Sequence, residues 1–181
     1  MSVGDPRQRG HVLVDQQDRL PARLEVSQAA PDLRPDERRE PLRRLVEEKA
    51  LFTGDVILGG STTVIPSDDG DLLEYLDSLR RLAQLDLRRI YPAHGPVIED
   101  APAKIQEYID HRLMRERQIL AALGDGIATI PDMVAKIYAE VPKELHPTAA
   151  MSVESHLKKL RKERRAREVV RRDAPSRWEL V

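Results

Sequence analysis

The sequence of 181 residues contains no cysteine, which excludes disulfide bonds, thiolate metal ligands and cysteine nucleophiles. Aromatic residues make up only 3% of the chain, whereas charged residues make up 34%. This composition predicts a helix-rich, well-solvated surface over a modest core. The length suits one ordinary domain or two small ones.

Two further absences bear on the location of the protein. No apolar run approaches the roughly 18 residues that a membrane span needs, and the N-terminus lacks the apolar segment of a signal peptide. The net charge of -1 gives no overall attraction to nucleic acid or membrane. We therefore expect no membrane partner and a cytoplasmic protein, with the mitochondrial matrix as the alternative compartment in a eukaryote.

Residues 1–44 show no sustained hydrophobic period. They mix charged residues with five prolines (Pro6, Pro21, Pro31, Pro35 and Pro41). Such a composition buries too little apolar surface to offset the entropy of ordering. We predict irregular or disordered structure here, with a short helix near 37–48. His11 is interpreted as a solvated loop residue.

Residues 45–100 have the pattern of an α/β layer. Two short apolar runs, 45–46 and 50–52, flank a charged turn and predict a strand pair. Asp71 has the position of a helix cap before a leucine-rich amphipathic stretch, and Leu87–Tyr91 predicts the next strand. Strand, helix and strand in this order indicate a βαβ unit, whose sites lie at the carboxyl ends of the strands.

Asp55 and His94 each follow one of these strands beside a glycine. Taken singly, Asp55 is explained as a turn-forming aspartate and His94 as a loop histidine. Taken together, a carboxylate oxygen and an imidazole nitrogen are a donor pair that suits zinc or a similar divalent ion. We therefore predict that both residues are metal ligands.

The segments Phe52-Thr53-Gly54-Asp55 and Tyr91-Pro92-Ala93-His94-Gly95-Pro96 resemble the last two ligand motifs of the metallo-β-lactamase-fold hydrolases. The resemblance extends through Gly59-Gly60-Ser61-Thr62-Thr63 and covers roughly residues 45–170. The longer sequence pattern is similar to that of the metallo-β-lactamase-like protein 2 group of zinc-dependent endoribonucleases. The resemblance implies two zinc ions in the intact site, with Asp55 as the bridging carboxylate and His94 as the final histidine of the second metal.

The chain departs from the family pattern upstream of Asp55, where the His-x-His-x-Asp-His motif and one further histidine are missing. We expect an incomplete αββα sandwich that lacks most metal ligands, because of a truncated or misassembled gene. The alternative is a chain that lost catalysis and kept its C-terminal module. An uncovered sheet face predicts aggregation or a homodimer.

Residues 101–181 predict a second, helical module. One helix runs from Pro102 to a cap at Gly124, a second starts after Thr129 and ends at Pro142, and a third covers about 148–164. A hairpin of 166–170 with 177–180 follows, in the order of a winged helix, with Trp178 as an anchor. In the third helix we expect Met151, Val153, Leu157 and Leu160 to face inward and Lys158, Lys159, Arg161 and Lys162 to face outward. His111 and His156 are interpreted as surface residues and His146 as a loop residue.

Basic residues gather at the end of the third helix, and two interpretations remain open for them. They form either a solvated charged face or a binding surface for single-stranded RNA, whose affinity depends on salt. The first hypothesis for the chain is an endoribonuclease-type hydrolase, and the second is a non-catalytic module that binds nucleic acid or protein. The candidate RNA-binding residues are Lys158, Lys159, Arg161, Lys162, Arg164 and Arg165.

Overall fold

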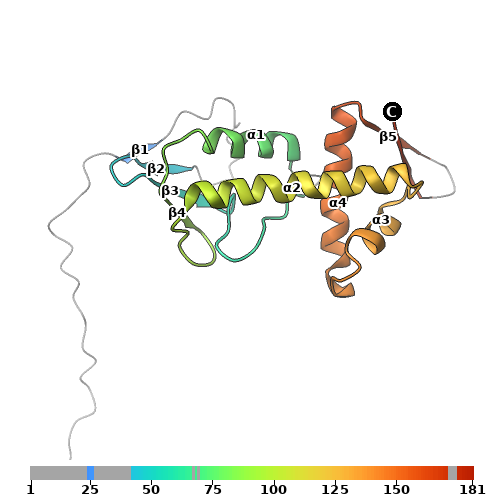
Figure 1. Ribbon diagram of the computed structural model, residues 1–181, viewed down its shortest axis with the longest axis horizontal. Coiled ribbons are helices and arrows are strands. Elements are labelled where there is room, and N and C mark those ends of the chain that lie inside the picture. Colours follow the sequence, from blue (N-terminus) through green and yellow to red (C-terminus); the bar gives the residue numbers. More distant parts are fainter. Residues whose placement is uncertain (1–23, 27–41, 67, 69, 171–174) are drawn as a thin grey trace, which may run out of the picture.

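The computed structural model describes residues 24–26, 42–66, 68, 70–170 and 175–181 (Figure 1). Its first unit is a four-stranded sheet in the order β1-β2-β3-β4. The strands are β1 (Leu24–Val26), β2 (Arg43–Leu45), β3 (Ala50–Gly54) and β4 (Arg89–Pro92). The α/β class predicted from the sequence is confirmed.

The segment before residue 46 differs from the prediction where the structure describes it. The helix expected near 37–48 is wrong over 43–48, which form strand β2 and a turn. The reason is tertiary: β2 pairs antiparallel with β3, with Leu45 opposite Ala50, and this ladder overrides the weak helical pattern. Residues 37–41 and His11 lie outside the described residues.

Strands β3 and β4 are the two neighbours that carry the candidate ligands. They run parallel and are joined by α1 (Leu72–Leu82), which confirms the βαβ unit. Asp71 caps α1 through its carboxylate, which accepts the backbone N–H groups of Leu73 and Glu74. Because β3 and β4 are parallel neighbours, their carboxyl ends lie at the same edge of the sheet.

The two faces of this sheet have different surroundings. Leu51 and Ile90 point into a core formed with α1 and with the next helix. Phe52 and Tyr91 alternate with them and lie on the other face, where their rings stack with centroids 5.0 Å apart. Phe52 remains 40% exposed, as the prediction of an uncovered face requires. Dimerisation across this face stays a prediction.

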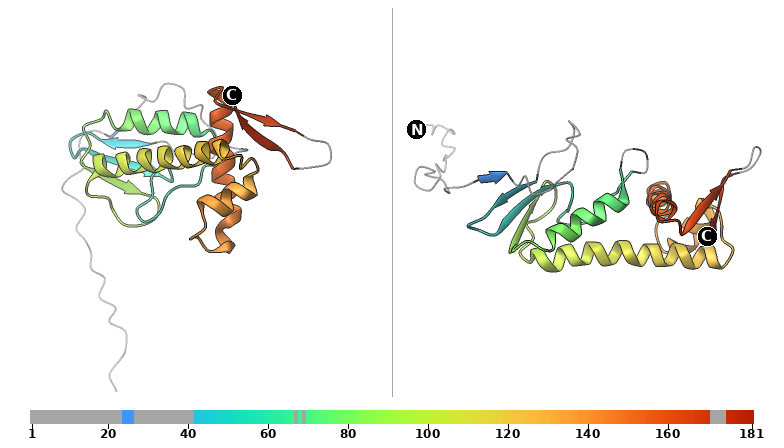
Figure 2. Two further views of the ribbon diagram at one scale, coloured as in Figure 1. Left: turned by 45° about the vertical axis from the view of Figure 1, so that its right-hand side comes forward. Right: turned by 90° about the horizontal axis from the view of Figure 1, so that it is seen from above.

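Helix α2 (Ala101–Gly124) runs from the sheet to the C-terminal unit (Figures 1 and 2). Ile105 and Tyr108 in its first half belong to the core of the sheet, and Ile119 in its second half belongs to the second core. The helix ends at Gly124 as predicted, but the glycine with the left-handed backbone is Gly126, at φ +80° after the capping Asp125.

The C-terminal unit has the helix, helix, hairpin order of a winged helix. Thr129 caps the first of these helices by accepting the N–H of Asp132. Trp178 is buried in the core of the unit, which fits the anchoring role predicted for it. The elements are α3 (Ile130–Ile137), the 3-10 helix η1 (Lys143–Leu145), α4 (His146–Lys162), β5 (Ala166–Val169) and β6 (Arg177–Leu180).

The structure of helix α4 differs from the prediction at four residues. Met151, expected inside, is 39% exposed, whereas Lys159 and His156, expected at the surface, are 4% and 1% exposed. His146 is the first residue of the helix, not part of a loop. The cause is that α4 packs against α2 as well as α3, so it buries two sides rather than the single side that a hydrophobic period shows.

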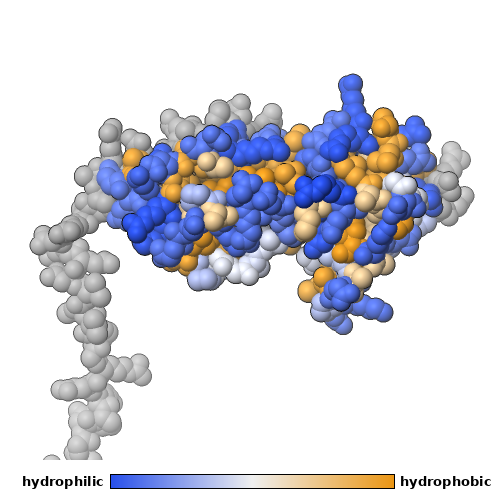
Figure 3. Space-filling model, viewed as in Figure 1, coloured by the Kyte–Doolittle hydropathy of each residue, from blue (hydrophilic) through white to orange (hydrophobic). Residues whose placement is uncertain are grey.

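The molecular surface agrees with the composition. Figure 3 shows a face dominated by hydrophilic residues, with hydrophobic residues visible in smaller zones between them. Within the described residues, no helix combines the length and the apolar character that crossing a membrane requires.

Candidate metal centre

The backbone brings Asp55 and His94 together at the edge of the sheet. Asp55 follows β3 directly, and His94 lies two residues after β4. Two hydrogen bonds connect the loops: the N–H of Ala93 donates to the carbonyl oxygen of Gly54 at 3.0 Å, and the N–H of Gly59 donates to that of His94 at 2.9 Å. The relative position of the two residues is thus held by main-chain contacts.

The side chains of Asp55 and His94 also meet. The Nε2 atom of His94 lies 3.5 Å from Oδ1 of Asp55, and the side chains are 76% and 69% exposed. Two ligands bound to one tetrahedral zinc ion at about 2.1 Å are separated by about 3.4 Å. A direct hydrogen bond would be shorter than the observed distance. The spacing therefore fits a shared cation better than a direct bond.

The number of donors falls short of a closed site. Zinc takes three or four protein ligands. Among the described residues, no group of three or more His, Cys, Asp or Glu side chains is placed to hold a metal ion. Asp55 and His94 therefore fit a divalent ion in type and spacing, but not in number, and no catalytic step follows from these two residues alone.

Two glycines allow the loops after Asp55 and His94 to approach closely. A Cβ atom on Gly59 would lie 2.2 Å from the carbonyl oxygen of Pro96. Gly95 has φ +88°, in the region that glycine tolerates best, and a Cβ atom there would lie 2.9 Å from Cα of Gly59. Side chains at either position would push the two ligand loops apart.

The loop after Asp55 is braced by hydroxyl groups that sequence reasoning missed. Tyr75 of α1 donates to the carbonyl oxygen of Val56 at 2.8 Å, and Tyr108 of α2 accepts the N–H of Leu58 at 2.9 Å. Burial raises the pKa of Tyr75 to about 12, so this phenol keeps its proton. The only sequence signal for such a brace is a tyrosine within an apolar helix stripe, which equally describes a core residue.

Thr63 and Arg112 extend the brace. The hydroxyl of Thr63 donates to the carbonyl oxygen of Asp55 itself at 2.7 Å. The guanidinium of Arg112, on α2, donates to the carbonyl oxygen of Thr63 and lies over the ring of Tyr75, 5.7 Å from its centroid. Arg112 is only 4% exposed. Its position in a charged helical stretch of the sequence does not predict this burial.

Five of the six basic residues predicted to bind RNA contact acidic side chains. Lys159 is held in a buried pair with Glu116 at 2.5 Å. Arg164, in a left-handed turn at φ +58°, is exposed and makes no ion pair among the described residues. The other pairs are Lys158–Glu154, Arg161–Glu168, Lys162–Asp71 and Arg165–Glu116.

The remaining described histidines lie away from the centre or have other partners. His156 is buried, with its ring nitrogens against the carbonyl oxygens of Ser152 and Arg112. His146 contacts the carbonyl oxygen of Val141 at 3.2 Å. The pKa of His111 is lowered, first by partial burial and then by nearby arginines, which favours its neutral form.

Comparison with known proteins agrees with this architecture. Residues 44–94 match the family described as the metallo-beta-lactamase superfamily, and residues 129–178 match the beta-lactamase associated winged helix domain. Residues 44–94 therefore carry a segment of the metallo-β-lactamase superfamily, and residues 129–178 carry the winged helix that is associated with it. Both features of the fold class predicted from the sequence are confirmed.

Individual relatives refine this assignment. The chain is 43% identical over 120 residues to the beta-lactamase-like protein 2 homolog of Caenorhabditis elegans, covering 66% of this chain and 39% of that protein. It is 41% identical over 126 residues to the homolog of Drosophila melanogaster, covering 67% and 41%. A metallo-beta-lactamase family protein from Thermus thermophilus superimposes with a TM-score of 0.65 at 25% identity, covering 78% and 45%. The chain spans about two-fifths of the length of the two curated relatives.

Proposed function

We propose that the chain forms part of a zinc-dependent hydrolase and supplies two of its metal ligands, with RNA phosphodiesters as substrates. The observation that carries the proposal is the 3.5 Å approach of His94 Nε2 to Asp55 Oδ1 at the ends of two parallel strands. Support for the hydrolase class comes from the superfamily match over residues 44–94. Support for RNA comes from the resemblance of the motifs to the endoribonuclease group.

In this proposal the residues of the chain have defined tasks. Zinc, when bound, lowers the pKa of a coordinated water to near 7. Asp55 presents an oxygen and His94 a nitrogen from loops that the main chain holds together. Further ligands must come from outside the described residues, since those residues contain no third donor at the pair.

The first prediction tests the metal ligands in the full chain. Zinc titrated into the protein should shift the imidazole resonances of His94 in a heteronuclear NMR spectrum, with a Kd much weaker than that of a closed zinc site. Replacing Asp55 by alanine should weaken this binding about tenfold or more, since it removes one of only two ligands. His94→Ala removes the reporting imidazole, so zinc binding by this variant is read from the backbone amides of Asp55 and Gly95, whose zinc-dependent shifts should be abolished.

Asp125→Ala is the matched control, because Asp125 is an exposed aspartate that pairs with Lys136 far from the sheet edge. It should leave the zinc titration of His94 unchanged. If zinc perturbs His111 or His146 as strongly as His94, the proposed centre is wrong. If zinc has no effect on His94, the proposal fails and the non-catalytic alternative is favoured.

A non-catalytic nucleic-acid-binding or protein-binding module is the second candidate, and the short ligand set favours it. The two candidates differ in one assay. A hydrolase should cleave single-stranded RNA only when zinc is present, and Asp55→Ala should stop the cleavage. A binding module should retain RNA without cleaving it.

The second prediction concerns RNA contact by the winged helix. Because five of the six candidate basic residues contact acidic side chains, we expect few phosphate contacts and a shallow dependence of affinity on salt, near -0.7 per contact in a log–log plot. Arg164→Ala should weaken RNA binding severalfold. It should also reduce the slope of log affinity against log salt concentration by the contribution of one phosphate contact. Fluorescence anisotropy at several salt concentrations measures both quantities.

Arg80→Ala is the control for general charge loss, since Arg80 is exposed on α1 and pairs with Asp77. It should leave RNA affinity close to that of the unmodified chain. Equal losses from Arg80→Ala and Arg164→Ala would contradict a specific role for the turn after α4.

A further inference from the structure

We infer that Thr63, in the segment 61–65, and Ser155 of the winged helix are positioning residues for the metal ligand Asp55. The inference rests on the proposed function, because it assigns the winged helix a role in shaping that centre. It concerns residues that touch no metal themselves. Three consecutive contacts carry it.

The first contact joins the segment to the ligand. Thr63 Oγ1 lies 2.7 Å from the carbonyl oxygen of Asp55 and 3.3 Å from that of Val56. The single hydroxyl proton therefore serves mainly Asp55. Because this bond grips the main chain of the ligand residue, a displacement of Thr63 displaces the start of the Asp55 loop.

The second contact joins the segment to α2. Arg112 donates to the carbonyl oxygen of Thr63, and its guanidinium also lies over the ring of Tyr75. The Nε atom of Arg112 is buried without a hydrogen-bond partner among the described residues. Because Arg112 is only 4% exposed, the carbonyl oxygen of Thr63 and the ring of Tyr75 are contacts that compensate its buried charge. Tyr75 in turn binds Val56, so the same group of side chains holds both sides of the loop.

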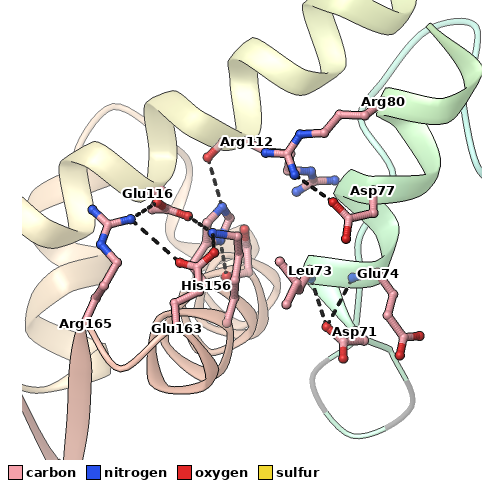
Figure 4. Close-up of polar contacts among 12 residues, drawn as sticks. Asp71, Leu73, Glu74, Asp77, Arg80, Arg112, Glu116, His156, Glu163 and Arg165 are labelled. Atoms are coloured by element: carbon pink, nitrogen blue, oxygen red, sulfur yellow. Dashed lines mark hydrogen bonds and ion pairs between the residues drawn. The ribbon is translucent and has the colours of Figure 1, made fainter. Parts of the chain in front are cut away.

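The third contact joins the segment to the winged helix. Ser155 Oγ on α4 lies 2.6 Å from the carbonyl oxygen of Ile65, and Ser155 is 5% exposed. The next residue, His156, places Nε2 3.2 Å from the carbonyl oxygen of Arg112. Figure 4 shows His156 of α4 directed at Arg112 of α2. The winged helix thus holds both the segment and the helix that supports it.

The segment depends on these contacts because residues 61–65 belong to neither a helix nor a strand. No ladder of backbone hydrogen bonds fixes their position. Tyr108 adds one more bond, from its hydroxyl to the carbonyl oxygen of Ser61 at 2.5 Å. Side chains of α2 and α4 therefore set the path of residues 61–65.

The experiment compares Thr63→Val, which removes the hydroxyl and keeps the shape, with Thr63→Ser, which keeps the hydroxyl. Ser155→Ala is compared with Ser152→Ala, a serine on the same helix whose hydroxyl lies 3.5 Å from that of Tyr138 and not at the segment. Two readouts are taken on the full chain. One is the zinc titration of His94, and the other is the hydrogen exchange of the Gly59 and Ala93 amides that connect the ligand loops.

We expect Thr63→Val to weaken zinc binding about tenfold, as changes to outer partners of metal ligands do, and Ser155→Ala to weaken it severalfold. The Gly59 and Ala93 amides should exchange faster in both variants. Thr63→Ser should restore both readouts, and Ser152→Ala should change neither. A purely structural role for the hydroxyls would accelerate exchange throughout the chain, the amide of Tyr138 at the end of α3 included.

Each other outcome has a definite meaning. Unchanged zinc affinity and unchanged exchange in Thr63→Val and Ser155→Ala overturn the inference and leave the proposed function intact. If the unmodified chain shows no zinc effect at His94, the proposed function fails, and the exchange of Gly59 and Ala93 alone decides the inference. Uniform acceleration of all protected amides also overturns it.

Discussion

Replacing Glu116 by glutamine is expected to lower the free energy of unfolding by about 3 kcal/mol, the lower end of the range for breaking a buried ion pair. Glu116 of α2 and Lys159 of α4 are 6% and 4% exposed, and their charged atoms lie 2.5 Å apart. Glutamine keeps the shape and removes the charge, so Lys159 stays buried with a single carboxylate, that of Glu163 at 2.8 Å. Figure 4 shows Glu116 and Glu163 together facing Arg165.

Urea denaturation at neutral pH measures this loss, and two further variants define its origin. The double replacement Glu116→Leu with Lys159→Met should recover most of the stability, because it leaves no buried charge without a partner. Lys136→Ala breaks an exposed pair with Asp125 and should cost less than about 1 kcal/mol. A loss from Glu116→Gln as small as that from Lys136→Ala would show that water reaches the pair in solution.

The same pair has a pH dependence with a definite sign. Burial alone would raise the pKa of Glu116, but the hydrogen bonds and charges of Lys159 and Arg165 outweigh burial and lower it below 4.5. A carboxyl whose pKa is lower in the folded state stabilises the fold above its unfolded pKa. Its contribution is then lost as the pH falls below about 4.5 and through the folded pKa.

The candidate metal centre could be predicted from the sequence because it depends on local signals. Asp55 and His94 each follow an apolar run and stand beside a glycine, and a helix between the two runs implies parallel strands with adjacent carboxyl ends. Main-chain geometry then places both residues at the same edge of the sheet. The proximity of His94 and Asp55 follows from that topology, and contacts such as that of Thr63 with the carbonyl oxygen of Asp55 then hold the loop in place.

The junction between α2 and α4 could not be predicted in the same way. A hydrophobic period identifies one buried face of α4, but Lys159 and His156 lie on a second face that exists only because α2 crosses the helix. The bond from Ser155 to the carbonyl oxygen of Ile65 spans two segments far apart in sequence, and a coil carbonyl has no residue-type signature. Tertiary contacts of this kind follow from the arrangement of the helices, which local patterns do not encode.

The largest pH effect is expected from His156. Its ring is 1% exposed, and burial, aided by the charge of Arg112, lowers its pKa to about 4 against the opposing effect of two carbonyl oxygens. The unfolded chain, with a pKa of 6.5, then binds more protons than the folded chain between pH 6.5 and about 4. Stability therefore falls as the pH drops through this window, by about 3 kcal/mol in total at about 1.4 kcal/mol per pKa unit.

Urea denaturation at pH 7.5, 5.5 and 4.5 tests this sign and size. Position 156 cannot titrate in His156→Gln, so the change in stability between pH 7.5 and 5.5 should shrink to the part contributed by His111, whose pKa is also lowered by burial. The variant starts from a lower stability because the buried contacts are altered. His146→Gln, on the first turn of the same helix, should keep the pH dependence of the unmodified chain. Most of this window lies above that of Glu116, so measurements at pH 7.5 and 5.5 separate the two groups.

Because His156 contacts the carbonyl oxygen of Arg112, acid should loosen α4 from α2 first, and with it the support of the segment that holds Asp55. A stability that stays flat from pH 7.5 to 5.5 in the unmodified chain would mean that His156 is charged or accessible in the folded protein, and that the α2–α4 junction is not closed.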